Sequence, residues 1–265
     1  MGGAQLPSRR RFLGILGRIG AAAPLAWLES ACFSSTAPEL PDPGGTGVLT
    51  TRWRAPSLTL EAGTYPLGLG TDRDGYIRLP AGYQPDRSAP LVLLLHGAGG
   101  DAAQWSGVFP LLDQLGIVAL AVDSRRQSWD LRYGYYGADV TFIDKALEKV
   151  FDSCAVDAGR MAICGFSDGA SYSLSLGLTN GDLFTHVIAF SPGFIDTDGR
   201  RGKPPIYFSH GIADMVLPIS FTRSTASLLR SEGYEVDLNE FAGGHEVPEA
   251  VAGAAYAWFV GSGVV

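Results

Sequence analysis

The chain has 265 residues and a formal net charge of -7 at pH 7. Binding to nucleic acid requires a basic face, so this acidic balance argues against a nucleic acid as the partner. Beyond about forty N-terminal residues with the character of a signal and a tether, the chain is long enough for one domain with a sizeable core.

The N-terminus carries an export signature. Residues 8–13 read SRRRFL, which matches the twin-arginine signal, and an apolar stretch follows from Phe12 to Leu28. Arg18 interrupts this stretch, which is also short for a membrane-spanning helix. We therefore expect a cleaved export signal over residues 1–31. The alternative is a basic start that happens to precede an apolar helix.

A lipid attachment site is predicted directly after this signal. Residues 28–32, LESAC, resemble a lipoprotein signal-peptidase site, although the leucine stands one position farther from the cysteine than usual. Residues 34–47 are rich in Ser, Thr, Pro and Gly, as a flexible tether would be. We expect a lipid on Cys32 and a tether over residues 32–56, which would hold a domain of residues 57–265 at a membrane in the periplasm or at the cell surface. The alternative is ordinary cleavage that releases a secreted protein.

The domain is predicted to begin with strands and to continue with alternating strands and helices. Short strands bounded by turn residues, and therefore antiparallel, are expected at 57–60, 65–70 and 76–79. Further strands are expected at 91–95, 117–122, 161–164, 187–190, 204–211 and 235–241, and helices at 140–151, 170–178, 221–232 and 247–260. This alternation predicts an α/β fold with a mostly parallel central sheet, helices on both faces, and a site at the carboxyl ends of the strands.

The most informative motif is Gly165-Phe166-Ser167-Asp168-Gly169. It follows a predicted strand and precedes a predicted helix, which is the setting of a G-x-S-x-G nucleophile elbow. The turn is so tight that side chains on either flank would clash, so glycine is required at both places. The motif predicts Ser167 as a nucleophile at the sheet edge.

A serine nucleophile needs a base and a carboxylate, and in this motif they follow in the order Ser, Asp, His. Asp214 lies just past the predicted strand at 204–211, and His245 lies on a Gly-rich loop after the predicted strand at 235–241. Taken singly, Asp214 could cap a helix and His245 could be an ordinary loop histidine. Together with Ser167 they predict a catalytic triad.

The strand at 91–95 ends in His96-Gly97-Ala98-Gly99-Gly100, which corresponds to an oxyanion loop. Such a loop presents backbone N–H groups to the negative charge of a tetrahedral intermediate, and we expect the donors to be the amides of Ala98 and Asp168. Asp168 would then act through its main chain. We expect the His96 ring to be structural.

These motifs together resemble the α/β-hydrolase superfamily, within it the bacterial carboxylesterase, phospholipase/carboxylesterase and polyhydroxybutyrate-depolymerase-like branch, over about residues 57–260. The resemblance implies hydrolysis of carboxylic esters of small molecules or polymers through an acyl-enzyme, without a cofactor. Many relatives carry another residue at the position of Asp168. Where many of them insert a helical lid, residues 191–204 here are short and polar, so we expect an uncapped site.

Aromatic residues near the expected site have two interpretations. Trp129, Tyr133 and Tyr136 lie after the strand at 117–122, and Trp105 follows the oxyanion loop. They could grip an apolar acyl group of the substrate. Equally, they could pack beneath the loop and roof the triad.

Two other classes of function are weaker. Residues 97–102 formally satisfy the dinucleotide-binding pattern G-x-G-x-x-A, with Asp123 about twenty residues on. That interpretation leaves the elbow, Asp214 and His245 unexplained. A lipoprotein that keeps the fold only as a binding module is the second alternative. No cluster of His, Cys and acidic residues has the spacing of metal ligands.

Overall fold

The computed structural model of the chain describes residues 45–58, 60–70, 72–196 and 198–261. The predicted signal over 1–31, Cys32 and most of the expected tether lie outside these residues. None of the helices in the described part is long and apolar enough to cross a membrane.

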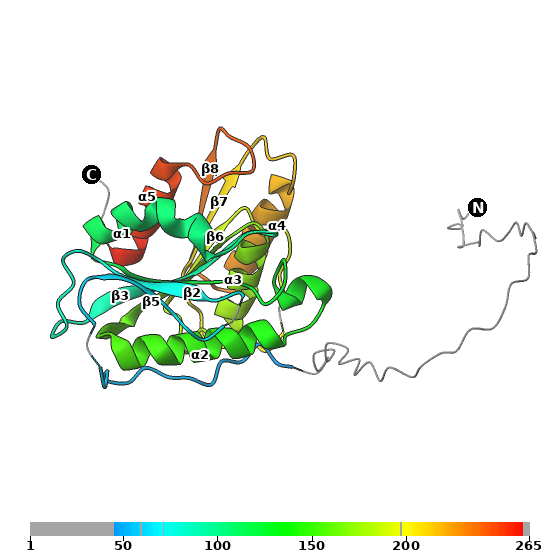
Figure 1. Cartoon of the computed structure of the whole chain (residues 1–265). Coiled ribbons are helices and arrows are strands. Elements are labelled where there is room, and N and C mark those ends of the chain that lie inside the picture. Colours follow the sequence, from blue (N-terminus) through cyan, green and yellow to red (C-terminus); the bar gives the residue numbers. More distant parts are fainter. Residues whose placement is uncertain (1–44, 59, 71, 197, 262–265) are drawn as a thin grey trace, which may run out of the picture. The chain divides into compact units, whose positions relative to one another are not determined.

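Within these residues, one eight-stranded sheet forms the centre of the domain (Figure 1). Its strands are β1 (Gly63–Pro66), β2 (Gly75–Leu79), β3 (Ala89–Leu95), β4 (Val118–Val122), β5 (Val156–Phe166), β6 (His186–Phe190), β7 (Ile206–Gly211) and β8 (Val236–Phe241). The strand order is β1-β2-β4-β3-β5-β6-β7-β8. β1 and β2 are antiparallel to their neighbours, and the remaining pairs are parallel. The mostly parallel sheet that the sequence predicts is confirmed.

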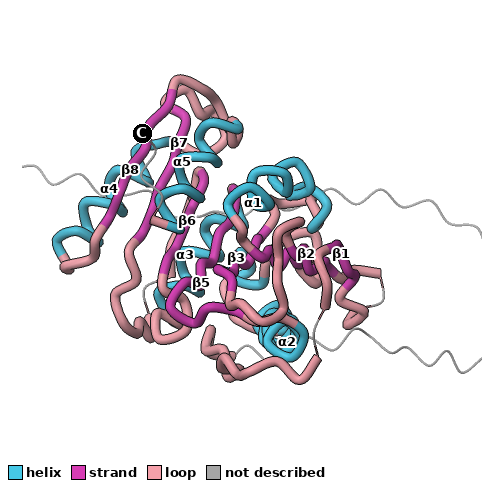
Figure 2. Tube along the Cα trace, turned by 90° about the vertical axis from the view of Figure 1, so that its left-hand side faces the viewer, coloured by secondary structure: helices cyan, strands magenta, loops and turns pink. Residues whose placement is uncertain are grey.

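Helices cover both faces of the sheet, as predicted. They are α1 (Phe109–Leu115), α2 (Ala138–Ser153), α3 (Asp168–Thr179), α4 (Ile219–Ser231) and α5 (Glu249–Val260), with the short 3-10 helices η1 (Ala102–Val108) and η2 (Asp130–Tyr133). Apolar side chains of α2, α3 and α4 join one core cluster, and those of α1 and α5 join the other. Figure 2 shows α1 and α2 on opposite sides of the strands.

Strand β3 shows why the sequence builds this sandwich. Leu91, Leu93 and Leu95 belong to the core on the α2 side, whereas Val92 and Leu94 belong to the core on the α5 side. Successive side chains of a strand point to opposite faces, so an unbroken apolar run marks a strand that is buried on both faces. The run therefore places β3 in the middle of the sheet, with its carboxyl end free to lead into a site loop.

The structure differs from the expectations at the start of the domain. The described residues of the strand expected at 57–60 are not in a strand, because the backbone N–H groups of Ser57 and Leu58 both donate to the carbonyl of Asp152 at the end of α2. Leu49 is fully buried in the core, and its N–H donates to the side chain of Asn180 at 2.8 Å. The folded domain thus includes residues that were expected to belong to the tether, and it begins before residue 57.

The connection between β3 and β4 also differs, because it contains η1 and α1, which the sequence analysis did not assign. Pro110 stands in the first turn of α1, where its missing N–H costs no hydrogen bond. Gly116 ends the helix in the left-handed conformation, with φ 67°. This pair of short helices forms one wall beside the site described next.

Candidate active site

The tight turn between β5 and α3 carries Ser167. Its backbone has φ 58° and ψ -121°, a strained conformation that residues other than glycine rarely adopt. A Cβ atom on Gly165 would lie 2.1 Å from the carbonyl oxygen of Gly169, and one on Gly169 would lie 2.2 Å from that of Leu95. Glycine on both sides of Ser167 is therefore a steric requirement of this turn.

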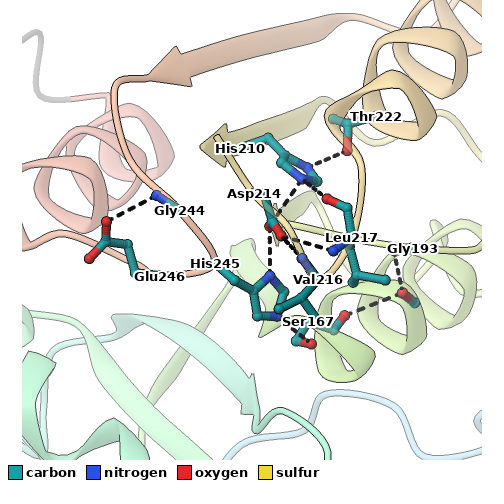
Figure 3. Close-up of polar contacts among 11 residues, drawn as sticks. Ser167, Gly193, His210, Asp214, Val216, Leu217, Thr222, Gly244, His245 and Glu246 are labelled. Carbon is teal, nitrogen blue, oxygen red and sulfur yellow. Dashed lines mark hydrogen bonds and ion pairs between the residues drawn. The ribbon is translucent and has the colours of Figure 1, made fainter. Parts of the chain in front are cut away.

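The structure brings the three predicted triad residues together (Figure 3). His245 Nε2 lies 2.8 Å from Ser167 Oγ, and His245 Nδ1 lies 2.6 Å from Asp214 Oδ2. Because a carboxylate only accepts hydrogen bonds, Nδ1 carries the ring proton. Nε2 is then the acceptor for the Ser167 hydroxyl, which is the arrangement of a general base beside its nucleophile.

The Asp214 carboxylate is buried, and it accepts several hydrogen bonds. Oδ1 accepts hydrogen bonds from the backbone N–H groups of Val216 and Leu217, each at 2.8 Å. Burial acts to raise the pKa of Asp214, but the hydrogen bonds from His245, Leu217 and Val216 outweigh it and hold the pKa below its usual value. Asp214 therefore stays ionised at neutral pH.

A second histidine, His210, lies behind the triad, and the sequence analysis missed it. Its Nε2 is 2.8 Å from the carbonyl oxygen of Leu217 and 3.3 Å from Asp214 Oδ2, and its Nδ1 is 2.7 Å from Thr222 Oγ1. A carbonyl only accepts, so Nε2 carries the proton and Nδ1 accepts from the Thr222 hydroxyl. His210 thus directs one N–H towards both Leu217 and Asp214 and braces the turn that holds the Asp214 carboxylate. Its place inside strand β7 makes it look like a core residue in the sequence.

The predicted oxyanion donors are available at the same edge. Among the hydrogen bonds of the described residues, neither the Ala98 nor the Asp168 N–H donates to a protein acceptor. The loop that presents Ala98 is fixed on its far side, because the N–H of Gly99 donates to the carbonyl of Gln127 at 2.6 Å. The Asp168 N–H belongs to the first turn of α3, where the helix dipole adds positive potential. Both groups can serve an oxyanion.

His96 is fully buried at the base of this loop. Its Nε2 accepts from the N–H of Ser124 at 2.9 Å, so Nδ1 carries the proton and donates to the carbonyl of Gly97 at 2.6 Å. Burial lowers the pKa of His96, which keeps the ring neutral. These contacts hold the loop in shape and give the ring a structural part.

The side chain of Asp168 anchors a neighbouring loop. One oxygen accepts from the Ser128 hydroxyl at 2.7 Å, and the other pairs with the Arg132 guanidinium at 2.8 Å. Residues 124–137 are thereby tied to the start of α3, next to the amide that faces the oxyanion position. The unusual residue at this elbow position has a structural explanation.

The aromatic residues divide between the two interpretations given above. Trp129 is 1% exposed, donates its indole N–H to the carbonyl of His96 at 2.8 Å and stacks on Tyr172. Tyr136 is 7% exposed and also packs on Tyr172. These two side chains lie beneath the loop, so the expectation that they grip the substrate is corrected to a packing role.

Tyr133 and Trp105 are placed differently from those two. Tyr133 is 48% exposed, beside the guanidinium of Arg126. Trp105 is 5% exposed, yet its side chain lines a cavity that His245 and Phe166 also border. Of the four aromatic candidates, Trp105 is the one placed at a cavity next to the triad.

The residues of the dinucleotide-binding pattern are engaged in other contacts. Asp123 accepts hydrogen bonds from the backbone N–H groups of Asp74 at 2.9 Å and Ala102 at 2.7 Å, so its carboxylate is not free to bind a ribose. The loop after β3 leads into η1 rather than directly into a long helix. In the described part of the chain, no group of three or more His, Cys, Asp or Glu side chains could hold a metal ion.

Comparison with known proteins identifies relatives. The family model named Esterase, described as "Putative esterase", matches residues 68–204, just over half of the chain. Feruloyl esterase C of Emericella nidulans is 32% identical over 157 residues, which are 56% of this chain and 57% of that protein. Feruloyl esterase D of Neurospora crassa is 25% identical over 169 residues, which are 58% of this chain and 57% of that protein. The match thus spans less than two thirds of either relative.

Solved structures show the same architecture. S-formylglutathione hydrolase of Staphylococcus aureus superposes with a TM-score of 0.60 at 14% identity, covering 71% of this chain and 92% of that one. Esterase PE8 superposes with a TM-score of 0.59 at 20% identity, covering 71% of this chain and 98% of that one. Esterase 2 of Thermogutta terrifontis with butyrate bound superposes with a TM-score of 0.57 at 19% identity, covering 76% of this chain and 91% of that one. The likeness establishes the α/β-hydrolase fold for this chain.

Proposed function

The chain belongs to the Esterase family, and from this premise we propose that it hydrolyses carboxylic esters through an acyl-enzyme formed on Ser167. The observation that carries the proposal is the continuous hydrogen-bond chain from Ser167 Oγ through His245 to Asp214 Oδ2, with links of 2.8 and 2.6 Å. A serine hydroxyl is a weak nucleophile until an adjacent, oriented base removes its proton. The two relatives described above are named feruloyl esterases, and an esterase cleaves the same type of bond.

In the acylation step, Ser167 Oγ attacks the carbonyl carbon of the ester while His245 Nε2 takes the hydroxyl proton. The carbonyl oxygen becomes an oxyanion, which accepts hydrogen bonds from the amides of Ala98 and Asp168. Asp214 remains ionised and stabilises the protonated ring. When the bond to the alcohol oxygen breaks, that oxygen takes the proton from His245 Nε2 and the alcohol leaves.

Deacylation repeats these steps with water. A water molecule gives a proton to His245 Nε2 and attacks the acyl carbon, and the same two amides hold the second oxyanion. The bond to Ser167 Oγ then breaks, and the serine oxygen recovers its proton from His245. The proton that Ser167 loses leaves with the alcohol and is replaced by one from water, so the triad ends the cycle unchanged and this route needs no cofactor.

The exposed position of the site favours accessible esters. Among the described residues of the β6–β7 connection, 191–196 and 198–205, no helix crosses over the triad. An uncapped site can receive small soluble esters or an exposed part of a polymer chain without a lid movement.

We also propose that the protein acts outside the cytoplasm, exported by the twin-arginine signal and held at a membrane by a lipid on Cys32. The support is in the sequence alone, from the SRRRFL signature and the LESAC segment.

The test of the proposed activity is ester hydrolysis by the full chain and by Ser167→Ala. We expect the wild type to hydrolyse a simple ester such as 4-nitrophenyl butyrate, and the variant to lose at least about 10⁴-fold in kcat, because the nucleophile is gone. Ser231→Ala, at an exposed serine at the end of α4, is the matched control and should retain activity. Hydrolysis by Ser167→Ala at the wild-type rate would contradict the proposal.

A further inference from the structure

A cavity of about 550 Å³ opens beside the catalytic histidine. One wall is the η1–α1 segment, residues 104–114, and the other is the segment from His245 to Ala252 at the start of α5. Phe166, the residue before the nucleophile, lies between them. Figure 1 shows α1 and α5 side by side on the same face of the sheet. The volume lies within the range of about 300–1,000 Å³ that is typical of small-molecule sites.

Apolar and polar side chains both line this cavity. The apolar side chains that line it are Trp105, Val108, Pro110, Leu111, Phe166, Val247 and Ala252. Phe166 also packs against the His245 ring, with ring centroids 4.7 Å apart. An apolar group of the substrate would therefore bury surface directly next to the reacting atoms.

The charged side chains of the cavity are all of one sign. Glu246 and Glu249 line it, and no lysine or arginine does. The ion pairs of glutamates in the described part of the chain involve Glu148, Glu232 and Glu240, so these two carboxylates have no ion-pair partner there. Both are exposed, and Glu246 also accepts a hydrogen bond from the backbone N–H of Gly244 at 3.2 Å. Their negative potential reaches a ligand in the cavity, and no lysine or arginine of the lining cancels it.

The position of His245 indicates which half of an ester enters the cavity. In the proposed reaction His245 Nε2 must return its proton to the oxygen of the leaving alcohol, so the alcohol departs on the side of this ring. His245 is itself part of the cavity wall, whereas Ser167 is not among the lining residues. The geometry therefore puts the alcohol group, and not the acyl group, in reach of the cavity.

We propose that this cavity binds the alcohol half of the ester, and that Glu246 and Glu249 make it selective for apolar alcohols that are cationic or uncharged over anionic ones. The inference rests on the proposed esterase function and adds a substrate class to it. It predicts that specificity depends on the charge of the alcohol more than on the charge of the acyl group.

The first experiment uses three butyrate esters whose alcohols differ in charge. The alcohols are 3,3-dimethylbutanol, its cationic isostere choline, and the anionic 3-hydroxypropane-1-sulfonate. We expect kcat/KM of the full-length wild type to be lowest for the sulfonate ester. The three esters differ in intrinsic reactivity. The decisive quantity is therefore, for each ester, the kcat/KM of a variant divided by the kcat/KM of the wild type.

The variant is the double substitution Glu246→Gln with Glu249→Gln. Removing both charges should raise kcat/KM for the sulfonate ester by about three- to tenfold relative to the neutral ester, and should lower it for the choline ester. The matched control is Glu235→Gln, which removes an exposed charge before the start of β8, at the opposite end of that strand from His245. This control should leave all three ratios unchanged.

Equal ratios for all three esters in the double variant would overturn the inference while leaving the esterase function intact. Failure of the wild type to hydrolyse any of these esters, or 4-nitrophenyl butyrate, would instead contradict the proposed function itself. The two failures are therefore distinguishable.

A second experiment tests which half of the ester occupies the cavity. Gly107 lines it, and a Cβ atom there would have no heavy atom within 4 Å, so Gly107→Trp can partly fill the space without distorting η1. We expect this variant to lose kcat/KM for hexyl butyrate and to keep it for methyl butyrate and methyl octanoate. Gly253→Trp is the control, because its Cβ also has free space and the residue is outside the cavity lining. A loss that follows the length of the acyl chain would overturn the assignment.

Discussion

Asp214 fixes the tautomer of the His245 ring, and the donors around its carboxylate make the proposed role of that ring testable. In Asp214→Asn the amide oxygen would remain with the N–H groups of Val216 and Leu217, which now bond to Oδ1. The amide nitrogen would then face His245 as a donor, so Nδ1 must accept and Nε2 carries the proton. Since that ring cannot take the proton of Ser167, we expect kcat to fall by about 10⁴ in steady-state kinetics.

The matched control for that variant is Asp196→Asn. Asp196 lies in the connection after β6 and accepts from the N–H of Asp198 at 3.1 Å. Like Asp214 it follows a parallel strand, but it makes no contact with His245 in the described structure, so its substitution should leave kcat close to that of the wild type. The opposite ranking of the two variants would place the catalytic acid in the earlier connection.

His210 provides a prediction about positioning. Its Nε2–H is shared by Leu217 and Asp214, so it acts on the reaction only through the carboxylate. We expect His210→Leu to lower kcat by about tenfold, equivalent to about 1.4 kcal/mol, with little change in KM. His210→Gln can place an N–H near the same position and should recover most of the loss. Equal rates in the two variants would show that only the packing of the side chain matters.

At the level of single residues, the sequence predicts the triad but not the residues that hold it in place, such as His210. Ser167, Asp214 and His245 are identifiable because the order of residues and the turns after strands constrain them. His210 is hidden because a histidine inside an apolar strand gives no sign of what it faces. The same holds for Trp129 and Trp105, since the orientation of an aromatic side chain in a loop depends on tertiary packing.

Among the elements, the loop of residues 124–139 ties the oxyanion region to helix α2. Asp139 at the start of α2 is buried, with the Asp130 carboxyl beside it, and it accepts from the N–H groups of Arg125 and Asp130. Burial, and then the neighbouring Asp130, raise the pKa of Asp139 to about 8. This shift favours the protonated form of Asp139 at neutral pH in the folded protein.

This raised pKa predicts how stability depends on pH. Between about pH 4 and pH 8 the unfolded chain releases the proton of Asp139 while the folded chain keeps it. Asp139 therefore makes the free energy of unfolding fall as pH rises through this window, by at most about 1.4 kcal/mol per pH unit. Above about pH 8 it no longer contributes to the pH dependence of that free energy. Denaturant titrations of Asp139→Asn, which mimics the neutral carboxyl, should show a flatter dependence. An unchanged slope would mean that Asp139 is already ionised in the folded state.

The elements themselves were largely predictable where the apolar pattern is strong. Helix α2 is identified by the helical spacing of its apolar residues, and strand β3 by a short unbroken apolar run that ends in a Gly-rich loop. The two short helices η1 and α1 were not predicted, because the short apolar stretch around Pro110 has too few repeats to define a helical period. The sequence of residues 57–60 has the residue types of a strand, but the N–H groups of Ser57, Leu58 and Leu60 donate to carbonyls at the end of α2 instead.

For the whole molecule, export can be tested separately from chemistry. Arg9→Lys with Arg10→Lys keeps the charge but removes the paired guanidinium groups, so we expect the precursor to stay in the cytoplasm. Cys32→Ala should permit export and release the protein from the membrane fraction, because the lipid cannot be attached. Cell fractionation with an immunoblot measures both. Membrane association that survives Cys32→Ala would contradict the lipid tether.

The most direct measurement of the central claim is covalent labelling of the nucleophile. An organophosphonate that carries a leaving group should react once per molecule of the full chain, and the adduct should lie on the peptide that contains Ser167. The variant His245→Ala should label far more slowly, because the hydroxyl has lost its base. Intact-mass and peptide mass spectrometry give both the stoichiometry and the site. An adduct of full stoichiometry on a peptide without Ser167, or none at all in the folded wild type, would contradict the account.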